Sequence, residues 1–307
     1  MNKSKKLGTN EKEFDVVAIG NAIVDILVYA NDEDINNHSL QKGNMVLIDQ
    51  EKVKELYSKH TNSQQQSGGS AANTIANFSL IGGKSGFMGR IKDDALGKVF
   101  SQDISSIGVR YESKPKLTGE NTAQCFIFVT PDGQRTMCTY LGASVYLGKE
   151  DLNFDLINNA KILYLEGYLW DSPQAKEAFI EAASFSKDMG GEIALSLSDS
   201  FCVERHRESF LDLINNKVDI LFANESEIKS LYKTEEIDEA IEKIKGKCKI
   251  ILITLGDKGS IILENENKVF IKPYFFGKAI DTTGAGDIYA SGFLKGYTEG
   301  RDIITSG

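Results

Sequence analysis

The segment Asp281–Asp287, with the sequence DTTGAGD, combines two carboxylates, two hydroxyls and two glycines. Glycines at positions 284 and 286 let the backbone approach an anion closely, and successive N–H groups in such a turn can bind the anion together. The small-residue helical pattern that follows would direct the positive end of its dipole at the same point. Asp287 would lie at the helix start, where a carboxylate can act as a general base. The alternative is that Asp287 only caps a helix that follows a glycine turn.

Two further motifs join glycine to a hydrogen-bonding side chain. Gly68–Asn73 (GGSAAN) precedes a second small-residue helical pattern, and Asn73 can both donate to and accept from a sugar hydroxyl. The alternative is a tight turn that lets a helix pack closely. Gly20–Asp25 (GNAIVD) follows an apolar run directly, and Asp25 needs partners if it is buried in this apolar stretch. The alternative is an aspartate in a loop that faces water.

Polar residues also follow two later apolar runs. Asn224 and Glu227, in the sequence NESE, lie one helical turn apart, and their amide and carboxylate groups suit a hydrated Mg²⁺ ion. Thr254–Gly259 (TLGDKG) comes at the end of another apolar run. It is most simply a hairpin turn, and only its place at the end of a predicted strand connects it with a site.

The elements that position these motifs follow from the spacing of apolar residues. Short runs rich in β-branched residues predict strands covered on both faces: Phe14–Ile19, Ile162–Leu165, Ile193–Leu197, Val218–Phe222 and Ile250–Thr254. Helical spacing lies between them, in Pro173–Lys187, Arg205–Asn215 and Ile237–Lys245. This alternation predicts an α/β domain with a mostly parallel sheet and helices on both faces. Ligands of such sheets bind beyond the carboxyl ends of the strands.

One region breaks the alternation. Two strand-like runs, Asn121–Thr130 and Gln134–Leu141, are joined by Pro-Asp-Gly, which is typical of a hairpin turn. Together with Ile26–Tyr29 and Met45–Ile48 they could form a small separate sheet. That sheet would be a lid over the site or, alternatively, an edge extension of the main sheet.

Charge and composition exclude several classes of protein. The chain has 35 basic and 44 acidic residues, a net charge of −9, which argues against partners such as nucleic acid or an anionic membrane surface. No apolar run approaches the roughly 18 residues of a membrane span, and the polar N-terminus is not a secretory signal. The four cysteines show no CxxC spacing and the three histidines are dispersed, so we expect free thiols in a cytoplasmic protein and no zinc site.

Taken together, these motifs resemble those of the ribokinase-like (phosphofructokinase B type) sugar and nucleoside kinases. GGSAANT, NESE, TLGDKG and DTTGAGD occur in the family's order, and the resemblance runs from about Phe14 to the end of the chain. Four stretches are similar to adenosine kinases rather than to sugar kinases: GNAIVDI, NTAQC, LSLSDSF and VDILFANESE. The resemblance implies one ribokinase-like α/β domain over residues 1–307. Its small β-sheet lid would be formed by residues 26–49 and 110–142, approximately.

The resemblance also implies roles for individual residues. Asp287 would be the general base that takes the proton from the acceptor hydroxyl. The anion hole would be formed by the N–H groups of Gly284, Ala285 and Gly286, and Arg135 on the lid would reach the phosphates. Substrate contacts would come from Asn21, Asp25, Gly68, Gly69, Asn73 and Tyr168. The ATP side would be formed by Asn224, Glu227, Thr254, Gly256, Gly259 and Thr283, with Glu227 organising Mg²⁺ through water.

These roles imply transfer of a phosphoryl group from MgATP to a primary hydroxyl, with adenosine as the expected acceptor. A ribokinase- or fructokinase-type sugar kinase is the alternative, and a non-catalytic nucleoside or sugar sensor is the second. An apolar lid surface would favour a nucleobase, against which Met45, Leu47 and Tyr168 could pack, although core packing is the alternative for each. The family usually continues with further helices that complete the adenine pocket, and we expect these to be missing here. The sequence leaves open a monovalent-cation requirement and whether the protein is a monomer or a homodimer.

Overall fold

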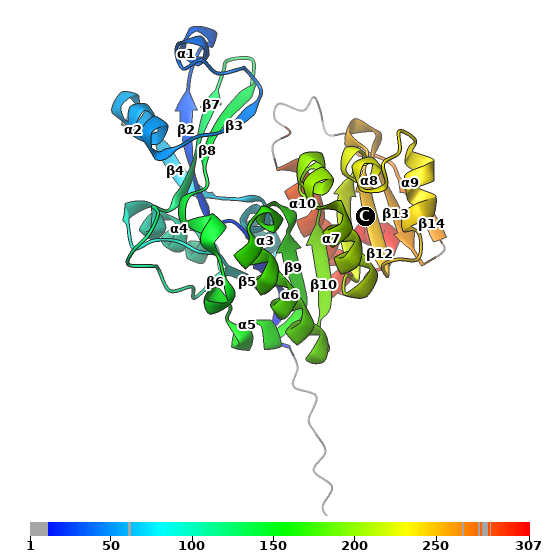
Figure 1. Cartoon of the computed structure of the whole chain (residues 1–307). Coiled ribbons are helices and arrows are strands. Elements are labelled where there is room, and N and C mark those ends of the chain that lie inside the picture. Colours follow the sequence, from blue (N-terminus) through cyan, green and yellow to red (C-terminus); the bar gives the residue numbers. More distant parts are fainter. Residues whose placement is uncertain (1–11, 61–62, 266, 276, 278–281, 283) are drawn as a thin grey trace, which may run out of the picture.

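The computed structural model describes residues 12–60, 63–265, 267–275, 277, 282 and 284–307, which form two β-sheets with helices packed around them (Figure 1). The larger sheet has nine strands in the order β14-β13-β12-β11-β10-β9-β1-β5-β6. Its strands are β1 (Phe14–Ile19), β5 (Ser85–Met88), β6 (Arg110–Tyr111), β9 (Ala160–Glu166), β10 (Glu192–Ser196), β11 (Ile220–Asn224), β12 (Ile250–Thr254), β13 (Ser260–Glu264) and β14 (Asn267–Ile271). All neighbours from β6 to β12 pair in parallel, and β13 and β14 complete the edge in antiparallel pairing.

Burial on both faces explains why the central strands are continuous apolar runs. In β9, Leu163 and Leu165 pack into one core and Ile162 and Tyr164 into the other, because successive side chains point to opposite faces. The first core is covered by α5 (Phe154–Asn158), α6 (Pro173–Asp188), α7 (Ser200–Asn216), α8 (Glu225–Tyr232) and α9 (Ile237–Ile244). The second is covered by α3 (Ser70–Leu80), α4 (Ala95–Ser106), α10 (Ala285–Thr298) and α11 (Ile303–Ser306). The predicted α/β architecture is confirmed.

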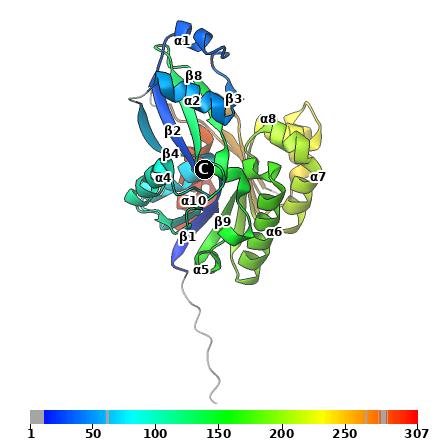
Figure 2. The same ribbon diagram turned by 60° about the vertical axis from the view of Figure 1, so that its left-hand side comes forward.

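The second sheet has five strands in the order β3-β8-β7-β2-β4 and extends from one side of the large sheet (Figures 1 and 2). Its strands are β2 (Ile23–Tyr29), β3 (Met45–Leu47), β4 (Gln64–Gly68), β7 (Ala123–Val129) and β8 (Arg135–Tyr140). The helices α1 (Asp32–Asn37) and α2 (Gln50–Lys59) belong to the same region, and Ile35 and Leu56 are buried in its core. The predicted hairpin is confirmed, since β7 and β8 pair in antiparallel register.

The boundaries of this sheet correct the expected lid segments of residues 26–49 and 110–142. Residues 110–111 form β6 and pair with β5 in the large sheet, and β2 already begins at Ile23. Residues 64–68, which carry no apolar alternation, form β4 because their backbone pairs with β2. The sheet is also separate from the large one, so it is not an extension of the latter's edge.

The remaining elements are short 3₁₀ helices. They are η1 (Gly142–Tyr146), η2 (Lys149–Asp151), η3 (Gly167–Asp171) and η4 (Gly256–Lys258). η4 lies in the turn between β12 and β13, which confirms the hairpin interpretation of TLGDKG. Among the residues that the structure describes, no helix has the length and apolar character needed to cross a membrane. The four cysteines are unpaired and buried.

Candidate active site

A cavity of about 540 Å³ lies at the carboxyl ends of the parallel strands. It is lined by the last residues of four neighbouring strands of the large sheet: Glu166, Ser196, Asn224 and Thr254. Side chains of β2, β3, β7 and β8 form its other wall, and the start of α10 closes one end. Both sheets therefore contribute to one site, at the edge of the parallel sheet where the motifs were predicted to meet.

Two helices begin at this cavity, each after a glycine with a left-handed backbone. Gly69 precedes α3 with φ of 103°, and Gly284 precedes α10 with φ of 72°. A side chain at position 69 would also lie 2.3 Å from the carbonyl oxygen of Asn21, so both the conformation and the space require glycine. The two helices pack against each other. Their N-terminal ends, where backbone N–H groups lack intrahelical partners, therefore face the same space.

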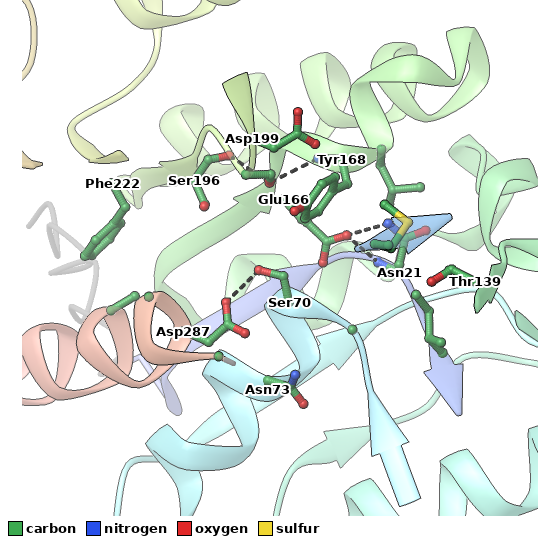
Figure 3. Close-up of a pocket in the computed structure, with 18 of the residues that line it drawn as sticks. Asn21, Ser70, Asn73, Thr139, Glu166, Tyr168, Ser196, Asp199, Phe222 and Asp287 are labelled. Carbon is green, nitrogen blue, oxygen red and sulfur yellow. Dashed lines mark hydrogen bonds between the residues drawn. The ribbon is translucent and has the colours of Figure 1, made fainter. Parts of the chain in front are cut away.

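Asp287 occupies the first turn of α10 and points into the cavity (Figure 3). Its Oδ1 accepts a hydrogen bond of 2.7 Å from the hydroxyl of Ser70, at the start of α3. Burial raises the pKa of the Asp287 carboxyl to about 6, against the opposing effect of hydrogen bonds from Ser70 and Asn73. Because the N-cap of α10 is Gly284 and has no side-chain bond, the simple capping role for Asp287 is wrong.

The turn before Asp287, which was predicted to form an anion hole, lies against the cavity. Gly284, Ala285 and Gly286 all line it, and the space around Gly286 is open. The N–H of Ala285, however, donates to the carbonyl of Thr282 at 3.1 Å and closes the turn. An anion would therefore meet the remaining first-turn N–H groups more readily than that of Ala285. Thr283 lies outside the described residues.

Glu166 is a fully buried carboxylate that sequence reasoning missed. Its Oε2 accepts from the Ala71 N–H at 2.8 Å, and its Oε1 accepts from both the amide side chain and the backbone N–H of Asn21. Burial raises the pKa of Glu166 to about 7. The Oδ1 atom of Asn21 is buried with no partner among the described residues, which leaves an acceptor for a ligand hydroxyl. The available signal was an acidic residue at the end of a buried strand.

Asp25 lies in β2, so the alternative of a water-facing loop residue is wrong. Its carboxyl packs against Gly68, where a Cβ would lie 2.4 Å away. Burial raises the pKa of Asp25 to about 7, and the charge of Arg135 acts in the opposite direction. Arg135 thus lies close enough to Asp25 for its charge to lower the pKa of the Asp25 carboxyl. Neither Arg135 nor Gly68 lines the cavity.

The wall formed by the small sheet is predominantly apolar. Alternate side chains of each strand face the cavity: Ile23 and Asp25 in β2, Met45 and Leu47 in β3, Cys125 and Ile127 in β7, and Met137 and Thr139 in β8. The Thr139 hydroxyl donates to the Cys125 thiol at 3.2 Å, so these two polar groups already satisfy each other. Tyr168 and Leu169 of η3 continue the wall from the large-sheet side, together with Asn73 of α3.

The end of β11 and the start of α8 bring Asn224 and Glu227 to the cavity. Asn224 caps α8: its Oδ1 accepts from the Glu227 N–H at 2.8 Å, and the Glu227 carboxylate accepts from the backbone and side-chain N–H groups of Asn224. Burial raises the pKa of Glu227 to about 7. Thr254 also lines the cavity, whereas Gly256 and Gly259 lie in the adjoining turn and do not.

The donor set of Asn224 and Glu227 can be tested for Mg²⁺. Within the described part of the chain, no group of three or more histidine, cysteine, aspartate or glutamate side chains is arranged to hold a metal ion. Both oxygens of Glu227 accept from Asn224, but a carboxylate oxygen has a second lone pair with which it can accept from a water molecule. The residues therefore fit a hydrated ion that arrives with a nucleotide, and not a metal ion held by protein ligands alone.

Comparison with known proteins agrees with this geometry. Residues 16–307 match the pfkB family of carbohydrate kinases. A probable sugar kinase protein from Rhizobium etli CFN 42 is 45% identical with a TM-score of 0.88, and the match covers 96% of this chain and 90% of that one. Adenosine kinase from Sinorhizobium meliloti is 44% identical with a TM-score of 0.87 and the same coverage. Probable fructokinase-5 from Arabidopsis thaliana is 28% identical over 244 residues, 77% of this chain and 75% of the relative. The protein thus belongs to the pfkB family of carbohydrate kinases and is a phosphotransferase with a hydroxyl group as acceptor.

Proposed function

We propose that the protein transfers the γ-phosphoryl group of MgATP to the 5′-hydroxyl of adenosine. The observation that carries this choice of acceptor is the apolar wall of the small sheet. Met45, Leu47, Ile127 and Met137 face the cavity there, and a nucleobase would bury its faces against them. A free pentose or hexose would place hydroxyls against the same side chains and leave them without partners. The name of the Sinorhizobium meliloti relative supports the same acceptor.

The polar residues of the cavity provide the other half of an acceptor site. Asp25, Asn73 and the unpartnered Oδ1 of Asn21 would bind the ribose hydroxyls, next to the apolar wall. This arrangement would direct the 5′-hydroxyl toward Asp287, which would take its proton as the phosphoryl group arrives. The N–H groups at the start of α10 would stabilise charge on the transferred group. Because such transfer has a loose transition state, positioning and charge stabilisation are most of what the protein must supply.

The nucleotide would approach from the part of the cavity that Asn224 and Glu227 line. Mg²⁺, when bound with ATP, neutralises phosphate charge, and Glu227 would orient the water molecules around it. The small sheet would act as a lid that excludes water from the reaction, with Arg135 reaching the phosphates if the lid closes. The four buried free cysteines support a cytoplasmic location as part of this proposal.

A sugar kinase is the second candidate, and the fructokinase relative favours it. A coupled assay of ADP release with adenosine, ribose and fructose tests the two, because only adenosine carries a base. We expect adenosine to give the highest kcat/KM. Turnover of a pentose or hexose with no turnover of adenosine would show that the proposed acceptor is wrong. Turnover of none of the three would mean that the acceptor is neither adenosine nor one of these two sugars.

Two neighbouring residues of β3 provide a sharper test of the apolar wall. Leu47 faces the cavity, and Val46 points to the opposite face of the same strand. Leu47→Ser should raise KM for adenosine about 10-fold, because it removes the apolar contact with the base, and should leave KM for a free pentose unchanged. Val46→Ser is the matched control and should change neither. Equal effects of the two substitutions would contradict a base-binding wall.

A further inference from the structure

The hydroxyl of Ser70 has no role in the site as described so far, although it touches the proposed base directly. Ser70 is the first residue of α3 and Asp287 lies in the first turn of α10, 217 positions later in the sequence. The hydroxyl donates to Oδ1 of Asp287 at 2.7 Å, and Figure 3 shows the two side chains pointing toward each other across the gap between the helices. Asn73 of the same helix also donates to this carboxyl, and each carboxylate oxygen keeps a further lone pair with which it can accept from an acceptor hydroxyl.

The backbone around Ser70 is held from several sides. On one side of it Gly69 adopts φ of 103° with the carbonyl of Asn21 close against its Cα, and on the other the Ala71 N–H donates to Glu166 at 2.8 Å. The carbonyl of Ser70 itself accepts from the Thr74 hydroxyl at 3.1 Å. These contacts connect Ser70 to the end of β1, the end of β9 and its own helix. The backbone contacts therefore fix the position from which the Ser70 hydroxyl donates to the Asp287 carboxylate.

A hydrogen bond from such a fixed donor has two consequences for a carboxylate. It restricts rotation about the Cβ–Cγ bond of Asp287, so that the carboxylate oxygens keep one orientation in the cavity. It also favours the ionised form, which is the form that accepts a proton. Both consequences concern the reactivity of Asp287 and neither requires that Ser70 touch the substrate.

We propose that Ser70 is a positioning residue that orients the Asp287 carboxylate through its hydroxyl. The inference deepens the proposed function, since it assumes that Asp287 is the base. Ser70→Ala should lower kcat about 10-fold and change KM for the acceptor less than about threefold, because the contact is made to the base and not to the substrate. The acid limb of the kcat profile should move upward by about 0.5 to 1 pH unit, because the ionised carboxylate loses a donor. The other titratable groups that interact with the charge of Asp287 stay in place in this variant: Asp25, Tyr164, Glu166 and Tyr168.

Two variants accompany this test. Ser70→Thr keeps the hydroxyl and should retain kcat within about threefold of the unchanged enzyme. Ser79→Ala is the matched control: Ser79 lies on the same helix, and its hydroxyl donates to the carbonyl of Ile107 at 2.8 Å, outside the cavity. It should change neither kcat nor the pH profile.

The outcomes separate this inference from the proposed function. If Ser70→Ala changes neither kcat nor the acid limb of the profile, the positioning role of Ser70 is wrong. A raised KM with unchanged kcat would also overturn this role, since that result would make Ser70 a substrate-binding residue. A titration of the Asp287 carboxyl by ¹³C NMR, assigned by its loss in Asp287→Asn, reads the same contact without turnover. If no acceptor is phosphorylated, the proposed function fails, and the shift of this titration in Ser70→Ala still decides the role of Ser70.

Discussion

The ionisation of Asp287 should set the acid limit of activity. Burial raises the pKa of its carboxyl to about 6, although the hydrogen bonds from Ser70 and Asn73 act in the opposite direction. A general base works in its ionised form, so kcat/KM should rise with pH through about 6. The perturbations are therefore a change of pH and the substitution Asp287→Asn, which removes the base and keeps the shape of the side chain.

The size of the pH effect follows from the raised pKa. With a pKa of about 6, the carboxyl is about nine-tenths ionised at pH 7 and about one-tenth ionised at pH 5, so kcat/KM should fall at least about 10-fold between them. An aspartate with the ordinary pKa of 3.8 would still be more than about nine-tenths ionised at pH 5. The expected loss is thus a consequence of burial. Asp287→Asn should lower kcat at pH 7 by about 10²- to 10⁴-fold.

The same shift predicts the opposite sign for stability. Because the folded state binds the Asp287 proton more tightly than the unfolded chain, the stabilisation is complete below about pH 3.8 and is lost as pH rises through about 6. At pH 8 the ionised carboxylate therefore costs the folded state at most about 3 kcal/mol, which Asp287→Asn removes. The inactive variant should be at least as stable as the unchanged protein at pH 8, which distinguishes loss of the base from loss of the fold.

The assay is coupled ADP release over a range of acceptor concentrations at saturating ATP between pH 5 and 8.5, which gives both kcat and kcat/KM, with thermal unfolding of each variant. Asp188→Asn, an exposed aspartate at the end of α6, is the control and should leave the profile unchanged. A profile that stays flat down to pH 5 would refute the raised pKa. An Asp287→Asn variant that folds and keeps more than about one-tenth of kcat would refute its role as base.

Two further substitutions test the acceptor side. Gly69→Ala would place a Cβ 2.3 Å from the carbonyl oxygen of Asn21, in a residue whose φ is 103°. We therefore expect the free energy of unfolding, measured with denaturant, to fall by about 1 to 3 kcal/mol. Steady-state kinetics should show a kcat/KM that is at least about 10-fold lower. Asp25→Asn should raise KM for the acceptor about 10- to 100-fold and change kcat little. The reason is that hydrogen bonds to a charged group are lost in the ground state and in the transition state alike. An unchanged KM would show that Asp25 does not bind the acceptor.

Much of the large sheet was predictable because the sequences of its buried strands are continuous apolar runs. β1 and β12 coincide with the predicted runs Phe14–Ile19 and Ile250–Thr254, since strands covered on both faces need continuous apolar side chains. The start of α10 was predictable for a related reason, because a glycine turn before a helix has few other uses than close approach to a ligand or a neighbour. In these segments the residues of the segment itself were sufficient to predict the element.

Other features depend on contacts that local sequence does not report. β4 is a polar run, Gln64–Gly68, and becomes a strand only because β2 offers backbone partners. The role of Glu166 depends on Asn21, in the connection between β1 and β2, and on Ala71, at the start of α3. Ser70 similarly gains its partner Asp287 through the packing of two helices. Each of these roles is tertiary, so a reading of neighbouring residues could not assign it.

The electrostatics of the cavity explain how an acidic protein can bind a polyanion. The chain has a net charge of −9, and four carboxyls with raised pKa values line the cavity. Because burial raises their pKa values, these four groups carry less negative charge near pH 7 than four ordinary carboxylates would. The burial that lets these side chains orient a substrate thus also reduces the charge that a nucleotide would meet. The N-terminal ends of α3 and α10 add positive potential at the same place, and Arg205 also lines the cavity, so the acidity of the chain as a whole does not determine the potential of its site.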